Sequence, residues 1–431
     1  MSPLGGPPVG ASPVRVLYVW DADYPWDVRT EKICRSLAQA GCDVAIIARN
    51  AAWKPEREGL PEGTVFRMPR WRIFGQRIDR ASSFPAFFNP RWIAHIAAGM
   101  RRHRPDVVIV RDLPLCPTAI WVARRFGTPV VLDMAENYAE MIRDVWAAGR
   151  KKPLDFLVRN PEIIAAVERY VLPRLDHIIT VVDESSDRLA ALGVPWDRLS
   201  VVSNTPPASR ADAVCTEPAR APRGAEEALH LTYLGLMEVP RGINDVLDAL
   251  AILRGEGRRI DLCLIGDGRD RMLFEARAAV LGLGPDAVRF MGALPNAEAL
   301  RLVGASDVGL VPHHAYASWN TTIPNKLFDY MAAGLPVVTS DAVPAARIVR
   351  GSGAGVVYRS GDAVDLATQL RPLFDLATRE RMALAGRQAV RKTYNWERDV
   401  DVLLHVVRSA GRPLRAAGVQ VQQPTWPSSR L

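Results

Sequence analysis

The chain has 431 residues, of which 48% are hydrophobic and 24% are charged, and its mean hydropathy is −0.02. This composition is typical of a globular protein, and no stretch has the roughly 18–20 consecutive apolar residues of a membrane-spanning helix. The formal net charge of +8 suits anionic ligands such as nucleotides, phosphates or lipid head groups. The five cysteines are scattered and include no Cys-x-x-Cys pair, which argues against a disulfide scaffold or a cysteine-based zinc site.

The N-terminal half alternates short apolar runs with helix-like segments. Residues 1–13 are rich in Pro and Gly and lack the apolar core of a secretory signal, so we expect a disordered tail and a cytoplasmic protein. Val14–Trp20, Thr30–Ala40 and Asp43–Ala48 then predict a strand, a helix and a parallel strand. Further strands are predicted at Asp106–Val110, Val130–Asp133, His177–Val182 and Val201–Asn204. This pattern predicts a doubly wound sheet over residues 14–205.

A second alternating region follows a segment that has no periodicity. Thr205–Glu227 is rich in Pro, Ala and Arg, which predicts a linker over residues 206–228. Strands are predicted beyond it at Leu229–Leu234, Asp261–Ile265, Val288–Met291, Val308–Val311 and Pro336–Thr339, with helices at Ile243–Arg254, Arg269–Leu281, Asn296–Gly304 and Asn325–Ala333. We therefore predict an α/β protein with two Rossmann-like doubly wound domains facing across a cleft. The second domain spans 229–394, a last helix spans 395–411 and a disordered tail spans 412–431.

The most informative stretch is Asn320–Asp341, which predicts a short helix that ends at Gly334. Asn325 and Asp329 are four residues apart and share one helix face, with Lys326 beside them. A free helix N-terminus with a nearby lysine suits a phosphate, and a carboxylate one turn further on can accept two ribose hydroxyl protons. The alternative is a capped surface helix on which Lys326 and Asp329 are solvated.

The run NKLFDYMAAGLPV at residues 325–337 resembles the donor-binding segment of family 4 glycosyltransferases, which have the two-domain GT-B fold. Other segments resemble the same family in the same order: Tyr233–Leu236 with Pro240–Ile243, Leu264–Gly268, Val288–Gly292, Ala305–Asp307 and Asn395–Glu397. The last of these resembles the start of a closing helix that crosses back to the first domain. The resemblance extends from Val14 to about Ser409.

This resemblance implies transfer of a sugar from a nucleoside diphosphate sugar to a hydroxyl of a saccharide or lipid-linked acceptor, in polysaccharide or glycolipid biosynthesis. It implies retention of the anomeric configuration, no metal ion and no cofactor. Asp329 would hold the ribose, Arg241 and Lys326 the diphosphate, and backbone amides the donor sugar. The implied donor-binding residues are Gly235, Arg241, Gly266, Gly268, Thr321, Thr322, Ile323, Asn325, Lys326 and Asp329. Fixed positive charge there would stabilise the departing diphosphate.

Three positions depart from the family pattern. Thr321 stands where the first Glu of a Glu-x7-Glu pair is usual, Leu236 where an Arg is usual, and Ala135 where a His is common. Two other functions therefore stay open. One is a catalytically degenerate partner or binding subunit with the same fold, and the other is a sugar-nucleotide epimerase.

Charged residues also follow the strands of the first half. Asp133 and Glu136 come after one strand, where a carboxylate can orient or deprotonate an acceptor hydroxyl. We expect these two residues, with Arg241 and Lys326, to be catalytic, and Asp27 and Arg29 to lie on the acceptor side. The alternatives are that the acids after the strand favour a helix N-terminus, and that Asp27, Arg29 and Glu31 pair with one another.

Arg67–Arg104 contains nine arginines and one acid, Asp79, with interleaved Trp and Phe residues. This mixture suits an anionic membrane interface or a lipid-diphosphate acceptor. The alternative is that the aromatic side chains pack in the core while the arginines are solvated. We expect no nucleic-acid partner, because no recognised nucleic-acid module is present. His313 and His314 are adjacent and have no carboxylate at ligand spacing, so they predict a cleft lining rather than a metal site.

Overall fold

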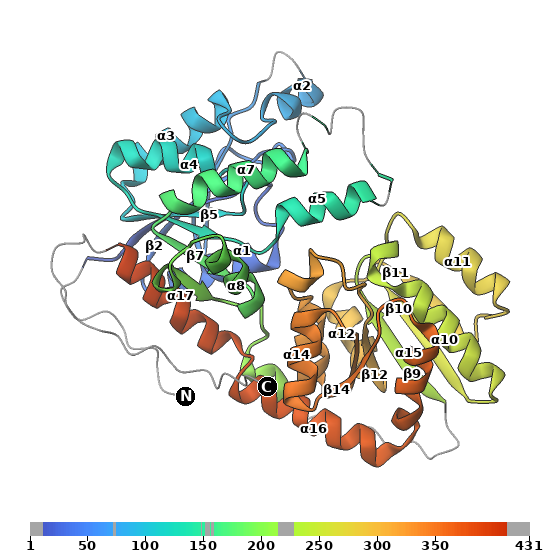
Figure 1. The fold of residues 1–431 in the computed structure, drawn as a ribbon. Helices are drawn as coiled ribbons and strands as arrows, with labels where there is room; N and C mark the ends of the chain where they lie inside the picture. The colour runs from blue at the N-terminus through green and yellow to red at the C-terminus, as the bar shows by residue number, and fades with distance from the viewer. Residues whose placement is uncertain are drawn as a thin grey trace.

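The structure is a computed structural model that describes residues 12–71, 75–147, 149–150, 156, 159–213 and 228–411. It has two lobes, each built on a predominantly parallel sheet with helices on both faces (Figure 1). The predicted two-domain α/β fold is therefore confirmed. The predicted tails, apart from residues 12–13, and residues 214–227 of the predicted linker lie outside the described residues.

The first sheet has eight strands in the order β3-β4-β2-β1-β5-β6-β7-β8, and only β3 runs antiparallel to its neighbour. Its strands are β1 (Arg15–Val19), β2 (Asp43–Ala48), β3 (Arg57–Leu60), β4 (Gly63–Arg67), β5 (Val107–Arg111), β6 (Val130–Asp133), β7 (His177–Thr180) and β8 (Leu199–Val201). Its helices are α1 (Val28–Gln39), α2 (Gly75–Ser82), α3 (Pro90–His103), α4 (Cys116–Ala123), α5 (Tyr138–Ala147), α7 (Pro161–Val171) and α8 (Asp183–Ala191). Parallel strands of this kind end at one edge, where ligands of such sheets bind.

The second sheet has six parallel strands in the order β11-β10-β9-β12-β13-β14. Its strands are β9 (Leu229–Leu234), β10 (Ile260–Ile265), β11 (Val288–Gly292), β12 (Val308–Val311), β13 (Val337–Ser340) and β14 (Gly355–Tyr358). Its helices are α10 (Ile243–Gly255), α11 (Arg271–Val280), α12 (Asn296–Gly304), α13 (Asn325–Ala333), α14 (Val343–Ser352), α15 (Ala363–Leu370) and α16 (Leu376–Lys392). The strand order reverses between β9 and β12, so a ligand crevice is expected at that point.

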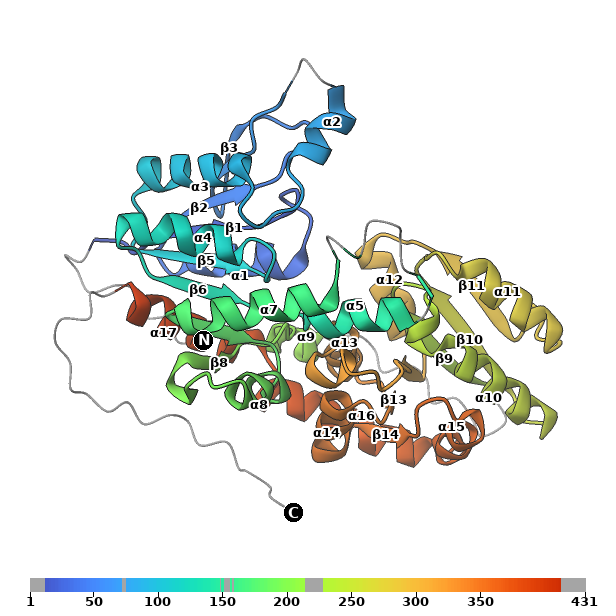
Figure 2. The ribbon, with the colours of Figure 1, turned by 45° about the horizontal axis from the view of Figure 1, so that its top comes forward.

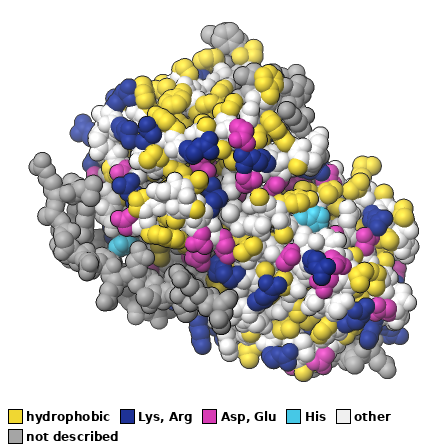
Figure 3. Space-filling model, in the orientation of Figure 1, with side chains coloured by type: hydrophobic (Ala, Val, Ile, Leu, Met, Phe, Trp, Pro, Cys, Tyr) yellow, Lys and Arg dark blue, Asp and Glu magenta, His cyan; other side chains and the backbone are white. Residues whose placement is uncertain are grey.

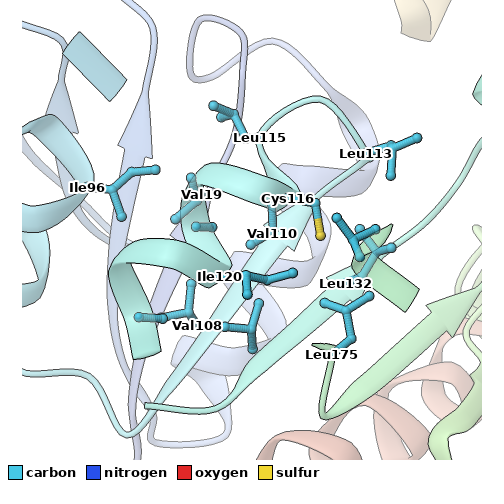
Figure 4. Packing of buried hydrophobic residues seen from close by; sticks show 14 of the residues in the cluster. Val19, Ile96, Val108, Val110, Leu113, Leu115, Cys116, Ile120, Leu132 and Leu175 are labelled. Atoms are coloured by element: carbon cyan, nitrogen blue, oxygen red, sulfur yellow. The ribbon is translucent and has the colours of Figure 1, made fainter. Parts of the chain in front are cut away.

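Burial on both faces explains why the central strands are continuous apolar runs. Every residue of β5 is buried, and Val108 and Val110 pack against Ile120 of α4 on one face of the sheet (Figure 4). A strand that is covered by helices on both sides has no solvent face, so it shows no alternation of polar and apolar residues. The only charged residue of β5 is Arg111 at its carboxyl end, where the sheet opens toward the site.

Two segments connect the lobes, and the second returns the chain to the first lobe. Helix α9 (Ala208–Ala213) lies within the predicted linker, where the sequence showed no periodicity, and packs against α13 and α16. Helix α17 (Trp396–Ala410) follows α16 and lies against the first lobe (Figures 1 and 2). Its apolar face joins the core of the first sheet, and the Trp396 indole N–H donates to the hydroxyl of Ser36 at 2.9 Å. Tertiary packing supplies the order of α9, because such a short helix is marginal alone.

The sequence did not predict several elements. These are β3, β4, β14, α2, α3, α9, α14, α15 and α16. Within the described ranges, no helix is long and apolar enough to cross a membrane.

We expect Trp396→Ala to lower the free energy of unfolding by about 3 kcal/mol or more, because a buried aromatic side chain and its hydrogen bond are lost. Urea denaturation followed by circular dichroism measures this change. Trp196→Ala is the matched control, since the Trp196 side chain is 58% exposed. Equal destabilisation by both variants would contradict the role of α17 as part of the first core.

Candidate active site

The carboxyl edge of the first sheet is held together by one buried carboxylate. Asp133 ends β6 and is fully buried. Its oxygens accept from the Arg29 guanidinium at 2.6 and 3.0 Å and from the Tyr18 hydroxyl at 2.9 Å, and Arg111 lies 3.7 Å away. Arg29 also donates to the Val202 carbonyl at 2.8 Å. The two guanidinium groups, together with hydrogen bonds, lower the pKa of Asp133 despite its burial.

This placement corrects two of the sequence predictions. Asp133 and Arg29 were expected to meet the acceptor, but their charged groups face each other below the surface. Arg29 is paired, but with Asp133 rather than with Asp27 or Glu31 as the alternative had it. Asp133 positions its neighbours, because its carboxylate is fully buried and accepts from Arg29 and Tyr18.

A pocket of about 280 Å³ lies above this layer, at the ends of β1, β5 and β6. Its lining is Trp20, Asp21, Ala22, Trp26, Asp27, Arg111, Asp112, Pro114, Glu136 and Tyr138. Asp27 caps α1 by accepting from the Thr30 amide at 2.8 Å. Asp112 follows β5 in a strained backbone conformation, with a φ of 60°, and accepts from the Ala135 amide at 3.1 Å. This turn places Arg111 and Asp112 in the pocket lining.

Glu136 is the acidic group of the pocket whose pKa suits proton transfer. Burial, with Asp112 and Asp27 nearby, raises the pKa of Glu136 to about 7, while Arg111 and Arg241 oppose the rise. The neighbours of Glu136 in the chain contact the second lobe, since the Ala135 carbonyl accepts from Thr322 and Asn137 lies beside Thr321. A carboxylate with this pKa can take a proton near neutral pH.

The second lobe presents a buried lysine at the end of β9. The Lys326 ammonium lies 3.7 Å from the centre of the Tyr233 ring, and no hydrogen-bond acceptor for it is present in the described part of the chain. Burial and the Arg241 charge hold the pKa of Lys326 well below its usual range. A Cβ on Gly235, whose φ is 143°, would lie 2.9 Å from Lys326 Nζ, so glycine keeps this space open.

Arg241 lies beside Lys326 and is held by an aromatic pair. One Arg241 nitrogen donates to His313 Nε2 at 3.2 Å, and its guanidinium lies 5.3 Å from the centre of the Trp319 ring. Burial and the charges of Lys326 and Arg241 hold the pKa of His313 well below its usual range, so the ring is neutral and can accept. The structure thus brings the two predicted phosphate-binding cations together.

Asp329 is bound by an arginine that the sequence reading missed. Arg210 of α9 forms an ion pair with the Asp329 carboxylate, and Lys32 of the first lobe adds a weaker attraction. The carboxylate of α13 is therefore neutralised by the connection between the lobes. No pattern in the sequence marks Arg210, because it lies in a segment without periodicity.

The remaining predicted donor residues border the cleft. Thr322 donates to the Ala135 carbonyl of the first lobe at 3.1 Å, and the Thr321 hydroxyl lies 3.4 Å from Asn137 Nδ2. Ile323 is buried and Asn325 is exposed. A Cβ on Gly266 would collide with the Gly235 carbonyl, and one on Gly268 would lie too close to Met237. These glycines thus let the turns after β9 and β10 pack together.

The departures from the family pattern lie in different environments. Leu236 is exposed, whereas Ala135 is buried at the boundary between the lobes. His313 is buried and packs edge-on against Trp319, with ring centroids 4.3 Å apart. In the described part of the chain, no group of three or more His, Cys, Asp or Glu residues is placed to hold a metal ion.

The remaining contacts between the lobes close the cleft. Helix α5 reaches the second lobe, where Asp144 accepts from Ser318 (Figure 2). The Arg347 guanidinium pairs with Glu184 at 2.6 Å, and Arg150 pairs with Asp270 at 2.8 Å.

Comparisons with known proteins agree with this geometry. The family described as "Glycosyl transferase 4-like domain" matches residues 27–205, and "Glycosyl transferases group 1" matches residues 228–375. The chain is 26% identical over 414 residues to glycogen synthase from Mycobacterium tuberculosis, covering 91% of each chain.

Two solved structures show the same fold. Sucrose-phosphate synthase from Thermosynechococcus elongatus has a TM-score of 0.70 at 18% identity, covering 92% of this chain and 98% of that one. Anabaena HepE in complex with UDP and glucose has a TM-score of 0.64 at 14% identity, covering 92% of this chain and 100% of that one.

We expect Asp133→Asn to lower the free energy of unfolding by about 3–5 kcal/mol, because it leaves Arg29 buried with its charge uncompensated. The folded pKa of Asp133 is depressed, so its contribution is present above the unfolded value near 3.9 and is lost as pH falls through the folded pKa. Urea denaturation from neutral to acid pH measures both effects. Asp43→Asn, at a more exposed carboxylate, is the control; a loss no larger than that of the control would contradict the role of Asp133.

Proposed function

Because the chain belongs to the family 4 glycosyltransferases of the GT-B fold, and is a glycosyltransferase, we propose that its second lobe binds a nucleoside diphosphate sugar. The observation that carries this proposal is the position of Lys326. Its buried ammonium has no hydrogen-bond acceptor among the described residues and lies at the Gly235 turn next to Arg241. A diphosphate would supply the missing acceptors and restore the charged form of the lysine.

The first lobe would then hold the acceptor. The bond from the sugar C1 to the diphosphate oxygen breaks, and its electron pair leaves with the nucleoside diphosphate. The acceptor oxygen forms the new bond to C1, and Glu136 takes the hydroxyl proton. Lys326 and Arg241 stabilise the negative charge that develops on the leaving group, and we propose that they do so without a metal ion.

The stereochemical outcome is part of the same proposal. The Arg241 charge lowers the pKa of Glu136 from the other side of the cleft. An acceptor hydroxyl at Glu136 and a leaving diphosphate at Arg241 would therefore lie close together. Attack from the side of the leaving group retains the anomeric configuration. Closed lobes would exclude water and so limit hydrolysis of the donor. The acceptor would be a saccharide or a lipid-linked saccharide in polysaccharide or glycolipid biosynthesis.

We also propose peripheral contact with an anionic membrane, at the inner face of the cell membrane. Trp71, Ile78, Phe84 and Phe88 are exposed on or beside α2, and we call them the α2 surface. Figure 3 shows hydrophobic side chains gathered on the upper lobe, where Figure 1 places α2 and α3. Apolar side chains next to arginines suit the head-group region of such a membrane.

Part of the Arg67–Arg104 segment is structural instead. Arg67 is buried and donates to the Tyr24 carbonyl at 2.9 Å, and Trp92 is fully buried. The Arg91 guanidinium pairs with Asp79 at 2.9 Å and lies 4.6 Å from the centre of the Trp71 ring. Trp92 therefore packs in the core, as the alternative had it, whereas the α2 surface is exposed and could contact a membrane.

We expect one of UDP, GDP, ADP and CMP to raise the free energy of unfolding by about 2.7 kcal/mol at a hundredfold excess over its Kd. Asp329→Ala should reduce this stabilisation, because the ribose hydroxyls lose their acceptor. Lys326→Met should abolish it and should stabilise the ligand-free protein by about 1–3 kcal/mol, since a buried polar amine without a hydrogen-bond acceptor is removed. Thermal and urea unfolding measure these changes.

Asp286→Ala is the control for Asp329→Ala, because the Asp286 side chain is 71% exposed. No stabilisation by any nucleotide would favour a degenerate binding subunit. Conversion of a sugar nucleotide in the absence of any acceptor, with no release of free nucleotide, would favour an epimerase. Either result would overturn the proposed transfer.

We expect the double variant Phe84→Ser/Phe88→Ser to weaken binding to vesicles that contain phosphatidylglycerol by about tenfold or more, because two apolar side chains no longer enter the interface. Co-sedimentation with vesicles of phosphatidylcholine alone and of the mixture measures the effect. Met272→Ser changes an exposed apolar residue of the other lobe and is the control. Wild-type protein that stays in the supernatant with both vesicle types would refute membrane contact.

A further inference from the structure

The carboxylates of the first-lobe pocket are only partly offset by basic residues. Asp21 pairs with Arg49 at the rim. Asp27 and Glu136 also line the pocket, and neither forms an ion pair within the described ranges. Asp27 therefore faces the space that an acceptor would fill with a carboxylate that only the N-terminus of α1 stabilises, and Glu136 adds an acid whose pKa of about 7 leaves it partly ionised at neutral pH.

Arg111 does not change this balance, although it lines the same pocket. Its guanidinium lies 3.5 Å from Asp112 and 3.7 Å from Asp133, so two carboxylates already offset its charge. The residue is only 7% exposed, and neither its Nε nor its Nη1 makes a hydrogen bond in the described part of the chain. Buried N–H groups without acceptors are costly, so a ligand oxygen at this point is favoured. Arg111 thus suits the hydroxyls of a polyhydroxylated ring.

Trp26 adds a second feature at the mouth of the pocket. Its indole is 75% exposed and stacks on Trp20, with ring centroids 6.0 Å apart and planes inclined by 21°. Its neighbour in the chain is Asp27. The face of a tryptophan ring attracts a cation, and a carboxylate next to it adds direct charge pairing.

We propose that this pocket takes an amine-bearing polyhydroxylated ring as the acceptor, with the ammonium group between the Asp27 carboxylate and the Trp26 face and a ring hydroxyl at Glu136. This rests on the proposed function, because it takes the pocket to be the acceptor site. A phosphate on the same ring would instead meet the Asp27 carboxylate and the partly ionised Glu136, and the pocket disfavours it.

Matched probes test the proposal on the full chain without any donor. Three methyl glucosides carry a hydroxyl, an ammonium or a phosphate group at C6, and a second set carries them at C2. Isothermal titration calorimetry at neutral pH measures their affinities. We expect the ammonium compound of at least one set to bind about tenfold more tightly than its hydroxyl parent, and both phosphates to bind more weakly than their parents.

Asp27→Asn removes the charge but keeps a side chain that caps α1 well, so the fold is preserved. It should reduce the affinity of the preferred ammonium compound to that of the hydroxyl parent, whose own binding stays unchanged. Asp362→Asn is the matched control, because Asp362 caps α15 in the other lobe by the same contact to a backbone amide, at 2.9 Å. It should leave the ammonium preference intact.

Three results would overturn the proposal: a phosphate that binds at least as tightly as its parent, ammonium compounds no tighter than their parents, or an unchanged preference in Asp27→Asn. Stabilisation by nucleotides, measured separately, distinguishes failure of the proposed donor site from failure of the proposed acceptor. If a nucleotide binds while the probes rank in the wrong order, only the acceptor assignment fails. If no nucleotide binds, the proposed function fails whatever the probes do.

Discussion

The charge of Asp133 is the constraint on which the first lobe depends. A buried carboxylate is tolerated only when donors or opposite charges surround it; here the donors come from α1 and β1, and β5 adds the charge of Arg111. One carboxylate therefore fixes where several elements end relative to one another. The pocket floor is the upper side of this layer, so its shape follows from the pairing below. The shape of the pocket and the stability of the lobe therefore depend on the same atoms.

The two sides of the cleft handle charge in opposite ways. The first lobe neutralises its deepest charges internally and leaves carboxylates at the surface of its pocket. The second lobe leaves Lys326 buried without a hydrogen-bond acceptor, next to Arg241. A buried amine without an acceptor lowers the stability of the empty protein, and an anionic ligand would recover that loss. This lobe is therefore less stable than its packing would allow until its ligand is bound.

The fold could be predicted from alternating apolar runs, and the positions of Lys326 and Asp329 on one short helix from their spacing. The burial of Asp133 could also have been anticipated, since it completes the buried strand VVLD. Arg210 could not, because pairing between a linker and a distant helix leaves no local pattern. The role of Trp26 was equally hidden, because an aromatic residue in a turn packs inside far more often than it stays exposed.

The path of the chain between the lobes has a mechanical consequence. It crosses once through the segment that contains α9 and again where α16 passes into α17. Two covalent crossings define a line, and rigid bodies joined at two points of a line can swing about it but cannot twist freely. Opening of the cleft is then a hinge motion with essentially one degree of freedom. Lys326 and Glu136 would separate and meet again along a fixed arc, so each closure would restore the same alignment without a search.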